Sequence, residues 1–326
     1  MLNEYFPYFD KFRLAKYTID LEAGYEGLEL PPYKGSTFRG GFGYAFKSMV
    51  CTRKSTECNN CILIEQCPYS YIFETAPSSE AKVLKNFLEV PRPYVIEPPL
   101  ERKVFYKAGE RLQCNLILIG KAVDMLPYFI VTFEELGRCG IGRGRKQFNL
   151  RKVIAHNLDG PTGCVYSAED RKVKNINATI TGRDLLDKAW QIKNSVNEIT
   201  LYFITPTRIK NSQRLCDKFE FYILMGSLLR RFSNLLYFHH GTQVRINYEA
   251  FIESCKGVSI IEDRTKWMEW ERFSHRQQSR MNMGGLMGKI TYCGQLDNYL
   301  PLLFLGEYIH VGKNVTFGLG KFMIKK

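Results

Sequence analysis

Apolar residues recur at helical spacing in two stretches of the chain. Between Ser36 and Val50 one face carries Phe38, Phe42, Ala45, Phe46 and Met49, and Ser36 or Thr37 can cap the first turn. The second stretch runs from about Asp217 to Phe238, and its apolar stripe is Phe219, Tyr222, Met225, Leu229, Phe232 and Leu236. Asp217 supplies a cap and Gly241 a stop. The pattern predicts a helix over each stretch.

Strand-like patterns precede each predicted helix and recur after it. The segment Phe9–Glu22 shows partial alternation of apolar and polar residues, and Glu198–Ile209 is rich in β-branched and aromatic residues and is limited by Pro206. The sequences FNLRKVIA and KFMI, each just after a glycine-rich stretch, also read as strands. We expect a strand over Leu302–Ile309 and a short helix around Leu185–Ile192.

The same order of elements occurs twice. In each half a strand, a helix and further strands lead to a glycine-rich loop and a last strand, although the residues themselves are not repeated. This order predicts an α+β protein of two tandem ferredoxin-like (RRM-like) domains. The expected boundaries are 1–156 for the first domain, 157–196 for a polar connection and 197–326 for the second domain.

Length and composition narrow the class of protein. The 326 residues are 45% apolar and carry a formal net charge of +13, which is enough apolar material for two cores and excludes wholesale disorder. No apolar run approaches the ~20 residues that span a bilayer. The first residues, MLNEYFPYFDKF, lack the basic start and apolar stretch of a signal peptide. We therefore expect a cytoplasmic protein.

The basic residues are concentrated in two regions. Leu136–Val153 holds six basic residues, four glycines and no acid, and Arg264–Lys289 holds six bases against two acids. Such density is typical of a polyanion partner, because each Lys or Arg that meets a phosphate releases counterions. Glycine beside the bases allows the backbone to approach a phosphate. A solvated basic surface is the alternative, but the pattern favours nucleic acid.

Four cysteines crowd into one short segment with the spacing C-x6-C-x2-C-x5-C. We expect Cys51, Cys58, Cys61 and Cys67 to hold a structural zinc ion in a small insertion at 51–67, because four thiolates close a tetrahedral site. An iron–sulfur cluster is the alternative that the Cys67–Pro68 pair suggests. A loop without metal is the third reading. None of these would perform catalysis.

Several motifs together resemble one family. They are PPYKGSTFRGGFGYAF, the cysteine cluster followed by YSYIFE, LGRCGIGRGR, TPTRIK, WERFSHRQ, MGGLMGKI and LLFLGEYIHVGKNVTFGLGKF. In this order they resemble the CRISPR-associated endoribonucleases that cut precursor repeat RNA, within the repeat-associated mysterious protein (RAMP) superfamily. The resemblance implies tandem ferredoxin-like domains, a basic cleft and cleavage within each repeat. It also implies a metal-independent reaction that leaves a 2′,3′-cyclic phosphate and a 5′-hydroxyl.

That reaction needs a general base, a general acid and a cation beside the phosphorane. Histidine suits the first two roles, but the chain has none between Met1 and Ala155. We expect His310 and Lys313, at the mouth of the last glycine-rich loop, to be catalytic, with His239 and His240 as the competing site. The alternatives are a turn cap at His310 and a helix-end cation at His239 and His240. His156 is interpreted as structural.

The expected RNA contacts follow the basic motifs. Arg138, Arg143, Arg145 and Lys146 lie in the acid-free segment Leu136–Val153, so no acid is expected to pair with them, which favours phosphate contact. Arg272, Arg276, Gln277 and Arg280 would share one face if their segment is helical. The full expected set is Lys34, Arg39, Arg138, Arg143, Arg145, Lys146, Arg208, Arg272, His275, Arg276, Gln277, Arg280, Lys289 and Lys321.

The sequence therefore predicts an endoribonuclease that processes CRISPR repeat RNA into guide RNAs. The rival from another class is a non-catalytic RAMP subunit that holds guide RNA in an effector complex, and a general zinc-containing RNA-binding protein is a third reading. The expected partners are the precursor RNA, other CRISPR effector subunits and a second copy of the chain, but no membrane.

Overall fold

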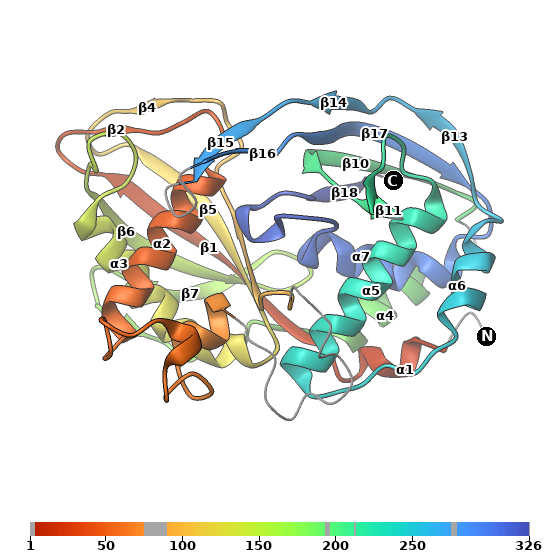
Figure 1. The fold of residues 1–326 in the computed structure, drawn as a ribbon, viewed down its shortest axis with the longest axis horizontal. Helices are drawn as coiled ribbons and strands as arrows, with labels where there is room; N and C mark the ends of the chain where they lie inside the picture. The colour runs from red at the N-terminus through yellow and green to blue at the C-terminus, as the bar shows by residue number, and fades with distance from the viewer. Residues whose placement is uncertain (1–3, 75–89, 193–195, 212, 275–278, 326) are drawn as a thin grey trace. The chain divides into compact units, whose positions relative to one another are not determined.

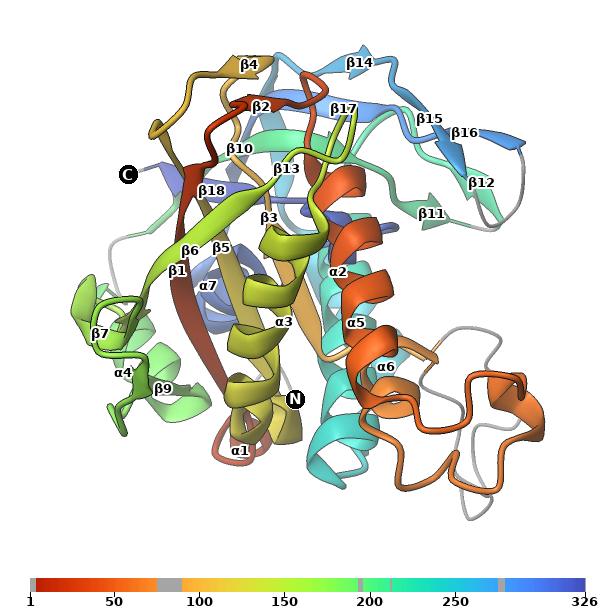
Figure 2. The same ribbon diagram turned by 90° about the vertical axis from the view of Figure 1, so that its left-hand side faces the viewer.

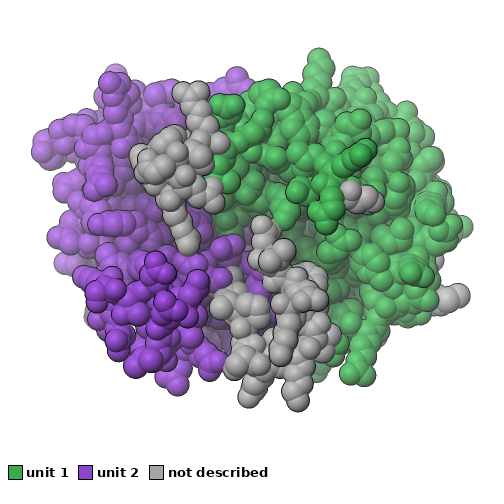
Figure 3. All heavy atoms as spheres, viewed as in Figure 1, with its two compact units in different colours: residues 1–12, 181–237, 241–326 green, residues 13–180, 238–240 purple. Residues whose placement is uncertain are grey.

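The computed structural model describes residues 4–74, 90–192, 196–211, 213–274 and 279–325, with the backbone alone at 272–274 and 279–280. The chain divides into two compact units, which Figure 3 shows in different colours. Unit 1 comprises 1–12, 181–237 and 241–326, and unit 2 comprises 13–180 and 238–240. Part of the expected connection thus belongs to unit 2, where residues 161–167 and 172–173 are strands.

Unit 2 has the element order βαββαβ. The six elements are β1 (Arg13–Ala23), α2 (Gly35–Val50), β3 (Tyr94–Glu97), β5 (Arg111–Ile119), α3 (Leu126–Cys139) and β6 (Phe148–His156). The sheet order is β3-β5-β1-β6, and the pairs are antiparallel. The sheet continues through β7 (Pro161–Ser167) and β8 (Lys172–Val173), β9 (Thr179–Thr181) pairs with β1, and a separate ladder joins β2 (Leu28–Glu29) to β4 (Phe105–Tyr106).

Both helices of unit 2 cover the same face of its sheet (Figure 2). Along β1 the residues Tyr17, Ile19 and Leu21 belong to the core that also holds aromatic residues of α2 and α3. The rings of Phe42 on α2 and Phe133 on α3 lie 4.9 Å apart. Because side chains alternate along a strand, Lys16, Thr18 and Asp20 fall on the face away from the helices.

Unit 1 repeats the same order if β13 and β14, which both pair with β17, count as one strand position. Its elements are β10 (Glu198–Thr207), α5 (Phe221–His240), β13 (Ser259–Asp263), β14 (Lys266–Met268), β17 (Gly285–Cys293), α7 (Leu300–Ile309) and β18 (Phe322–Lys325). The sheet order is β13-β17-β10-β18, with β14 also on β17. Figure 1 shows α5 and α7 on one side of this sheet. The remaining elements of the unit are α1 (Phe6–Phe9), α4 (Gly182–Ile192), α6 (Tyr248–Cys255), the pair β11 (Lys210–Asn211) and β12 (Arg214–Leu215), and the pair β15 (Glu271–Ser274) and β16 (Ser279–Asn282).

Residues 4–12 pack into the core of unit 1, although they precede the whole of unit 2 in the sequence. Tyr5, Phe9 and Phe12 are all at most 1% exposed. The ring of Phe9 lies 4.8 Å from that of Phe232 on α5, and the ring of Tyr5 lies 5.6 Å from that of Phe251 on α6. The core of unit 1 therefore combines residues that come before unit 2 in the sequence with residues that follow it.

The predicted helices over 36–50 and 217–238 are confirmed as α2 and α5, although α5 begins only at Phe221, and the predicted short helix lies within α4. The predicted caps at Ser36 or Thr37 and at Asp217 are wrong, because the N-cap residues are Lys34 and Glu220 and neither side chain caps its helix. The predicted strand Leu302–Ile309 is wrong, because α7 covers Leu300–Ile309. The helix considered for 272–280 is also wrong: β15 and β16 pair as a hairpin around residues outside the described ranges. No helix in the described part of the chain is long and apolar enough to cross a membrane.

Candidate nucleic-acid interface

A glycine-rich loop follows helix α3 in unit 2. Gly140 ends the helix with φ 80° and ψ 158°, and Gly142 has φ 71°. The amide of Ile141 donates to the Lys146 carbonyl at 2.9 Å, and the amide of Arg143 donates to the Glu29 carbonyl at 3.0 Å. These bonds fix the loop against β2 and leave the Arg143 side chain exposed.

The loop that follows α7 in unit 1 has the same construction. His310 ends the helix with φ 58° and ψ 174°, and Gly312 has φ 85°. The amide of Val311 donates to the Gly320 carbonyl at 3.0 Å, and the amide of Lys313 donates to the Arg208 carbonyl at 2.9 Å. Residue by residue, the segment His310–Lys313 of unit 1 therefore corresponds to the segment Gly140–Arg143 of unit 2.

Both loops lie close to a backbone carbonyl, which explains why each has a glycine at the equivalent position, Gly142 or Gly312. A Cβ atom at Gly142 would overlap the Glu29 carbonyl oxygen, and one at Gly312 would overlap the Arg208 carbonyl oxygen. Positive φ angles at both positions add to the same requirement. The result is that each unit presents one basic residue, Arg143 or Lys313, at an equivalent point of its fold.

The basic side chains of the unit 2 loop have acidic neighbours, two of them distant in the sequence and one only three residues away. Arg143 lies 3.1 Å from Glu29, Lys146 pairs with Glu26, and Arg138 lies 2.8 Å from Glu135. The prediction that no acid is near them is therefore wrong. Surface pairs of this kind contribute only about 0–1 kcal/mol, so a phosphate can replace the acid. Arg145 is exposed and makes no ion pair in the described part of the chain.

In unit 1 the basic residues near the second loop are partly engaged. An Arg208 guanidinium nitrogen donates to the Asn282 carbonyl, and Lys289 lies 2.6 Å from Glu262. Lys313 and Lys321 are half-buried, and the amide of Lys321 donates to Thr205 Oγ1 at 2.9 Å. Since the Lys313 amide bonds to the Arg208 carbonyl, these two basic residues share one end of β10.

Lys34 and Arg39, at the start of α2, have internal partners. Lys34 is fully buried, and its Nζ donates to the Glu101 carbonyl at 2.6 Å. Desolvation lowers the pKa of Lys34, and the Glu101 carboxylate opposes this change. Arg39 is half-buried, with its guanidinium 5.2 Å from the centre of the Phe73 ring. The contacts of Lys34 brace the turn before the helix and offer no exposed surface for RNA.

The structure places His310 in the interior of unit 1. Its side chain has no exposed surface, and Nδ1 lies 3.0 Å from the Leu319 carbonyl oxygen. A carbonyl only accepts, so this nitrogen carries the proton. In this conformation the ring bridges the two ends of the glycine-rich loop and does not reach a phosphate outside it.

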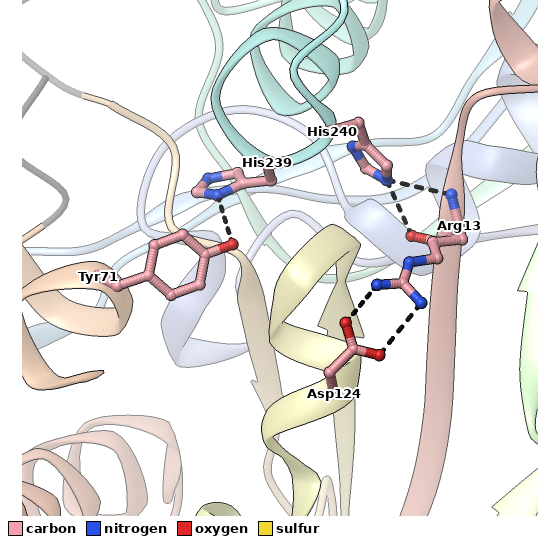
Figure 4. A network of polar contacts seen from close by, with 5 residues as sticks. All are labelled: Arg13, Tyr71, Asp124, His239 and His240. Carbon is pink, nitrogen blue, oxygen red and sulfur yellow. Dashed lines mark hydrogen bonds and ion pairs between the residues drawn. The ribbon is translucent and has the colours of Figure 1, made fainter. Parts of the chain in front are cut away.

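His239 and His240, at the end of α5, belong by their contacts to unit 2 (Figure 4). His239 is 2% exposed, with Nε2 2.6 Å from the Pro91 carbonyl oxygen and Nδ1 3.2 Å from the Tyr71 hydroxyl. His240 Nε2 lies 3.1 Å from the Arg13 amide nitrogen and 3.2 Å from its carbonyl oxygen. The Arg13 guanidinium in turn pairs with Asp124. Both rings therefore hold backbone groups of unit 2.

The remaining predicted contacts fall where the side chains are not described. His275, Arg276 and Gln277 lie outside the described residues, and of Arg272 and Arg280 only the backbone is described, in β15 and β16.

The prediction of a zinc site at the four cysteines is wrong. Cys51, Cys58, Cys61 and Cys67 all lie within described residues as free, half-buried thiols. No group of three or more His, Cys, Asp or Glu side chains in the described part of the chain is arranged to hold a metal ion. The 51–67 segment forms turns and the 3-10 turn Cys58–Asn60. The C-x2-C spacing suggested a ligand set, but spacing alone does not fix how four thiols converge. The zinc-containing RNA-binding protein loses its basis with this site.

Two units, each with two helices on one face of its sheet and a basic glycine-rich loop before its β6 or β18 strand, define a mixed α/β protein with antiparallel sheets. Comparison with known families agrees. A family model described as an N-terminal domain matches residues 12–178, about half of the chain, and the model of the CRISPR-associated endoribonuclease Cas6 matches residues 201–322. Residues 201–322, more than a third of the chain, thus belong to the family of the CRISPR-associated endoribonuclease Cas6.

Relatives of known sequence or structure cover nearly all of the chain. An uncharacterized protein of Archaeoglobus fulgidus is 26% identical over 300 residues, which is 91% of this chain and 93% of that protein. A Cas6 product complex gives a TM-score of 0.57 at 15% identity, covering 96% of this chain and 99% of that one. Thermus thermophilus Cas6 gives 0.52 at 14% identity with the same two coverages.

Two similar structures are much longer than this chain. A partial Cas6-RT-Cas1–Cas2 complex gives a TM-score of 0.55 at 16% identity and covers 96% of this chain. This chain spans 46% of that protein chain and 29% of the one in the second complex of this type. At such identities the likeness establishes the fold.

Proposed function

We propose that this protein binds CRISPR repeat RNA in the precursor transcript and cuts it within each repeat to release guide RNAs. The observation that carries the proposal is the pair of equivalent loops, in which Arg143 and Lys313 take the same place in the two units. The Cas6 family model over 201–322 and the fold shared with a Cas6 product complex support it.

The proposed fold is a tandem of two ferredoxin-like domains. The supporting observation is the βαββαβ order of each unit together with the equivalent sheet orders β3-β5-β1-β6 and β13-β17-β10-β18. In such a duplicated fold each half contributes its own loop to RNA binding. Phosphate contacts from Arg143, Arg145, Lys313 and Arg208 would then supply affinity with little dependence on sequence.

The proposed chemistry uses the RNA's own 2′-hydroxyl as nucleophile and no metal ion. The 2′-oxygen attacks the adjacent phosphorus, the 5′-oxygen leaves, and the products are a 2′,3′-cyclic phosphate and a 5′-hydroxyl. The protein has only to move protons and to stabilise charge on the phosphorane, which side chains can do.

The test is cleavage of end-labelled repeat RNA in excess chelator, followed by analysis of the product ends. We expect cyclic phosphate and 5′-hydroxyl ends at an unchanged rate in the chelator. Replacement of the single 2′-hydroxyl at the cut site by hydrogen should abolish cleavage and leave binding nearly intact. Cleavage of the deoxy substrate would refute the mechanism, and loss of activity in chelator would refute metal independence.

A second function is favoured by the environment of the histidines. His239 and His310 are at most 2% exposed and bind backbone carbonyls, as expected of a non-catalytic RAMP subunit that holds guide RNA in an effector complex. Such a protein would bind repeat RNA with the same salt dependence but would not cut it under any condition. Other CRISPR proteins are proposed partners in either case. A homodimer is also proposed, and a measurement of the molecular mass in solution tests it.

A further inference from the structure

A row of polar side chains crosses four strands of unit 2 on the face away from α2 and α3. It runs from Glu97 on β3 through Asn115 on β5 and Thr18 on β1 to His156 at the end of β6. Asn115 Nδ2 lies 2.9 Å from Glu97 Oε2, Thr18 Oγ1 lies 2.9 Å from Asn115 Oδ1, and His156 Nε2 lies 2.8 Å from Thr18 Oγ1. Glu97 is buried and His156 is half-buried.

The chemistry of the row sets the direction of each hydrogen bond. An ionised carboxylate only accepts, so Glu97 must face the amide nitrogen of Asn115, and the amide oxygen then faces Thr18. The Thr18 hydroxyl donates its single proton to that oxygen. Its own oxygen is left to accept from His156, which must therefore carry a proton on Nε2. The row thus fixes the imidazole as the Nε2–H tautomer with a lone pair on Nδ1.

This arrangement distinguishes His156 from the other described histidines. His239 bonds through both ring nitrogens, His240 holds the Arg13 backbone, and His310 is fully buried. His156 Nδ1 makes no hydrogen bond within the described part of the chain, and its ring is partly exposed. A general base needs an accessible lone pair. Among these four described rings, His156 offers a nitrogen lone pair without a change in the conformation of the protein.

The charged group that faces His156 is Lys16, its cross-strand neighbour on β1. On the other side β7 places Pro161 opposite it, and the remaining charge of the row, Glu97, is two residues away through Asn115 and Thr18. Burial lowers the pKa of His156 below its ordinary value, and the positive charge of Lys16 lowers it further. The ring is therefore neutral at pH 7, as a general base must be.

We propose that His156 is the general base of RNA cleavage, with Lys16 beside it to offset charge on the phosphorane. The inference rests on the proposed ribonuclease function. Nδ1 takes the proton of the ribose 2′-hydroxyl as the 2′-oxygen bonds to phosphorus. The P–O5′ bond breaks, the leaving 5′-oxygen takes a proton from water, and the imidazolium returns its proton to the hydroxide so formed. Thr18, Asn115 and Glu97 are positioning residues.

The first experiment is single-turnover cleavage of repeat RNA by His156→Ala, with Lys172→Ala on the exposed strand β8 as the control variant. Loss of a general base should slow cleavage by about 10²–10⁴-fold, with RNA affinity changed only a few-fold. Imidazole added to His156→Gly should restore part of the rate. Wild-type rates in His156→Ala, in a protein that binds RNA normally, would overturn the assignment.

The second experiment reads the tautomer without any activity. Long-range ¹H–¹⁵N correlation spectra of the wild-type chain at pH 7.5 should show His156 protonated on Nε2, and Thr18→Val should lose this preference. A His156 protonated on Nδ1 would overturn the hydrogen-bond row. If the wild-type protein binds repeat RNA but cuts none, the proposed function fails together with this inference. If it cuts and the His156 variants cut equally well, only the inference fails.

Discussion

His310 occupies a backbone conformation that is almost exclusive to glycine. We therefore expect glycine to be more stabilising than alanine at this position. With φ 58° and ψ 174° it lies where a Cβ atom is crowded, and the equivalent residue of the other unit is Gly140. We predict that His310→Gly is more stable than His310→Ala. At ordinary positions alanine is the more stabilising of the two residues, because glycine loses more conformational entropy when the chain folds.

The magnitude follows from what the two variants share. Both lose the buried imidazole and its bond to the Leu319 carbonyl, so these losses cancel in the comparison. Alanine keeps the backbone strain of about 1–3 kcal/mol, whereas glycine removes the strain and costs about 0.5–1 kcal/mol in unfolded-state entropy. The glycine variant should therefore be more stable by roughly 0–2.5 kcal/mol, and by about 1 kcal/mol at the middle of both ranges.

Tryptophan fluorescence suits the assay, because Trp190, Trp267 and Trp270 are the only tryptophans of the sequence and all belong to unit 1. Urea unfolding of both variants then reports the unit that contains residue 310. With a slope of about 2 kcal/mol per molar, a difference of about 1 kcal/mol separates the midpoints by roughly 0.5 M. Gly140→Ala is the matched control in unit 2 and should destabilise its unit, since the new Cβ overlaps the Arg145 carbonyl; because unit 2 holds no tryptophan, its unfolding is followed by circular dichroism. An alanine variant at residue 310 that is more stable than the glycine variant would refute the strain argument.

Three further predictions concern charge. Arg145→Ala should lower the log–log salt slope of RNA binding by about one unit, and an unchanged slope in filter binding would remove the unit 2 loop from the RNA path. Lys34→Met should cost unit 2 about 1–3 kcal/mol in urea unfolding, because the Glu101 carbonyl loses its donor, while the salt slope of RNA binding stays the same; a smaller slope would make Lys34 an RNA contact. The pKa of His156 is lowered in the folded state, so the unfolded chain binds more protons as the pH falls below about 6.5, and stability declines until the folded-state pKa is passed. Urea unfolding at pH 7.5 and 5.5 should show a smaller decline for His156→Gln than for the wild type, and equal declines would contradict the lowered pKa.

The helices that a sequence pattern could predict are those with one apolar face. Phe38, Phe42 and Phe46 mark α2 by their spacing, and the predicted start is within one residue of Gly35. Helix α7 has no such stripe, because Leu300–Gly306 are all buried. A short run that is apolar on every side does not distinguish a buried helix from a buried strand by periodicity. The helix was therefore predicted as a strand.

The site was predictable only where function lies in consecutive residues. The glycine and basic residues of 140–146 and 310–321 identified both loops, since each loop is one segment of sequence. The partners Glu26 and Glu29 lie more than 100 positions from the basic residues they meet. The row that ends in His156 draws single residues from four strands, and only the sheet register brings them together. No local pattern marks such a row.

The burial of residues 4–12 in unit 1 sets the order in which the protein can be completed during synthesis. Phe12 emerges from the ribosome 220 positions before Phe232, against which it packs. At about 5–20 residues per second this interval is roughly 10–45 s. The sheet strands and two helices of unit 2 are made meanwhile, whereas Tyr5, Phe9 and Phe12 have no core to enter until α5 follows. These aromatic residues are thus made before all of unit 2 but are buried only after it, and a nascent chain stalled before α5 carries them uncovered.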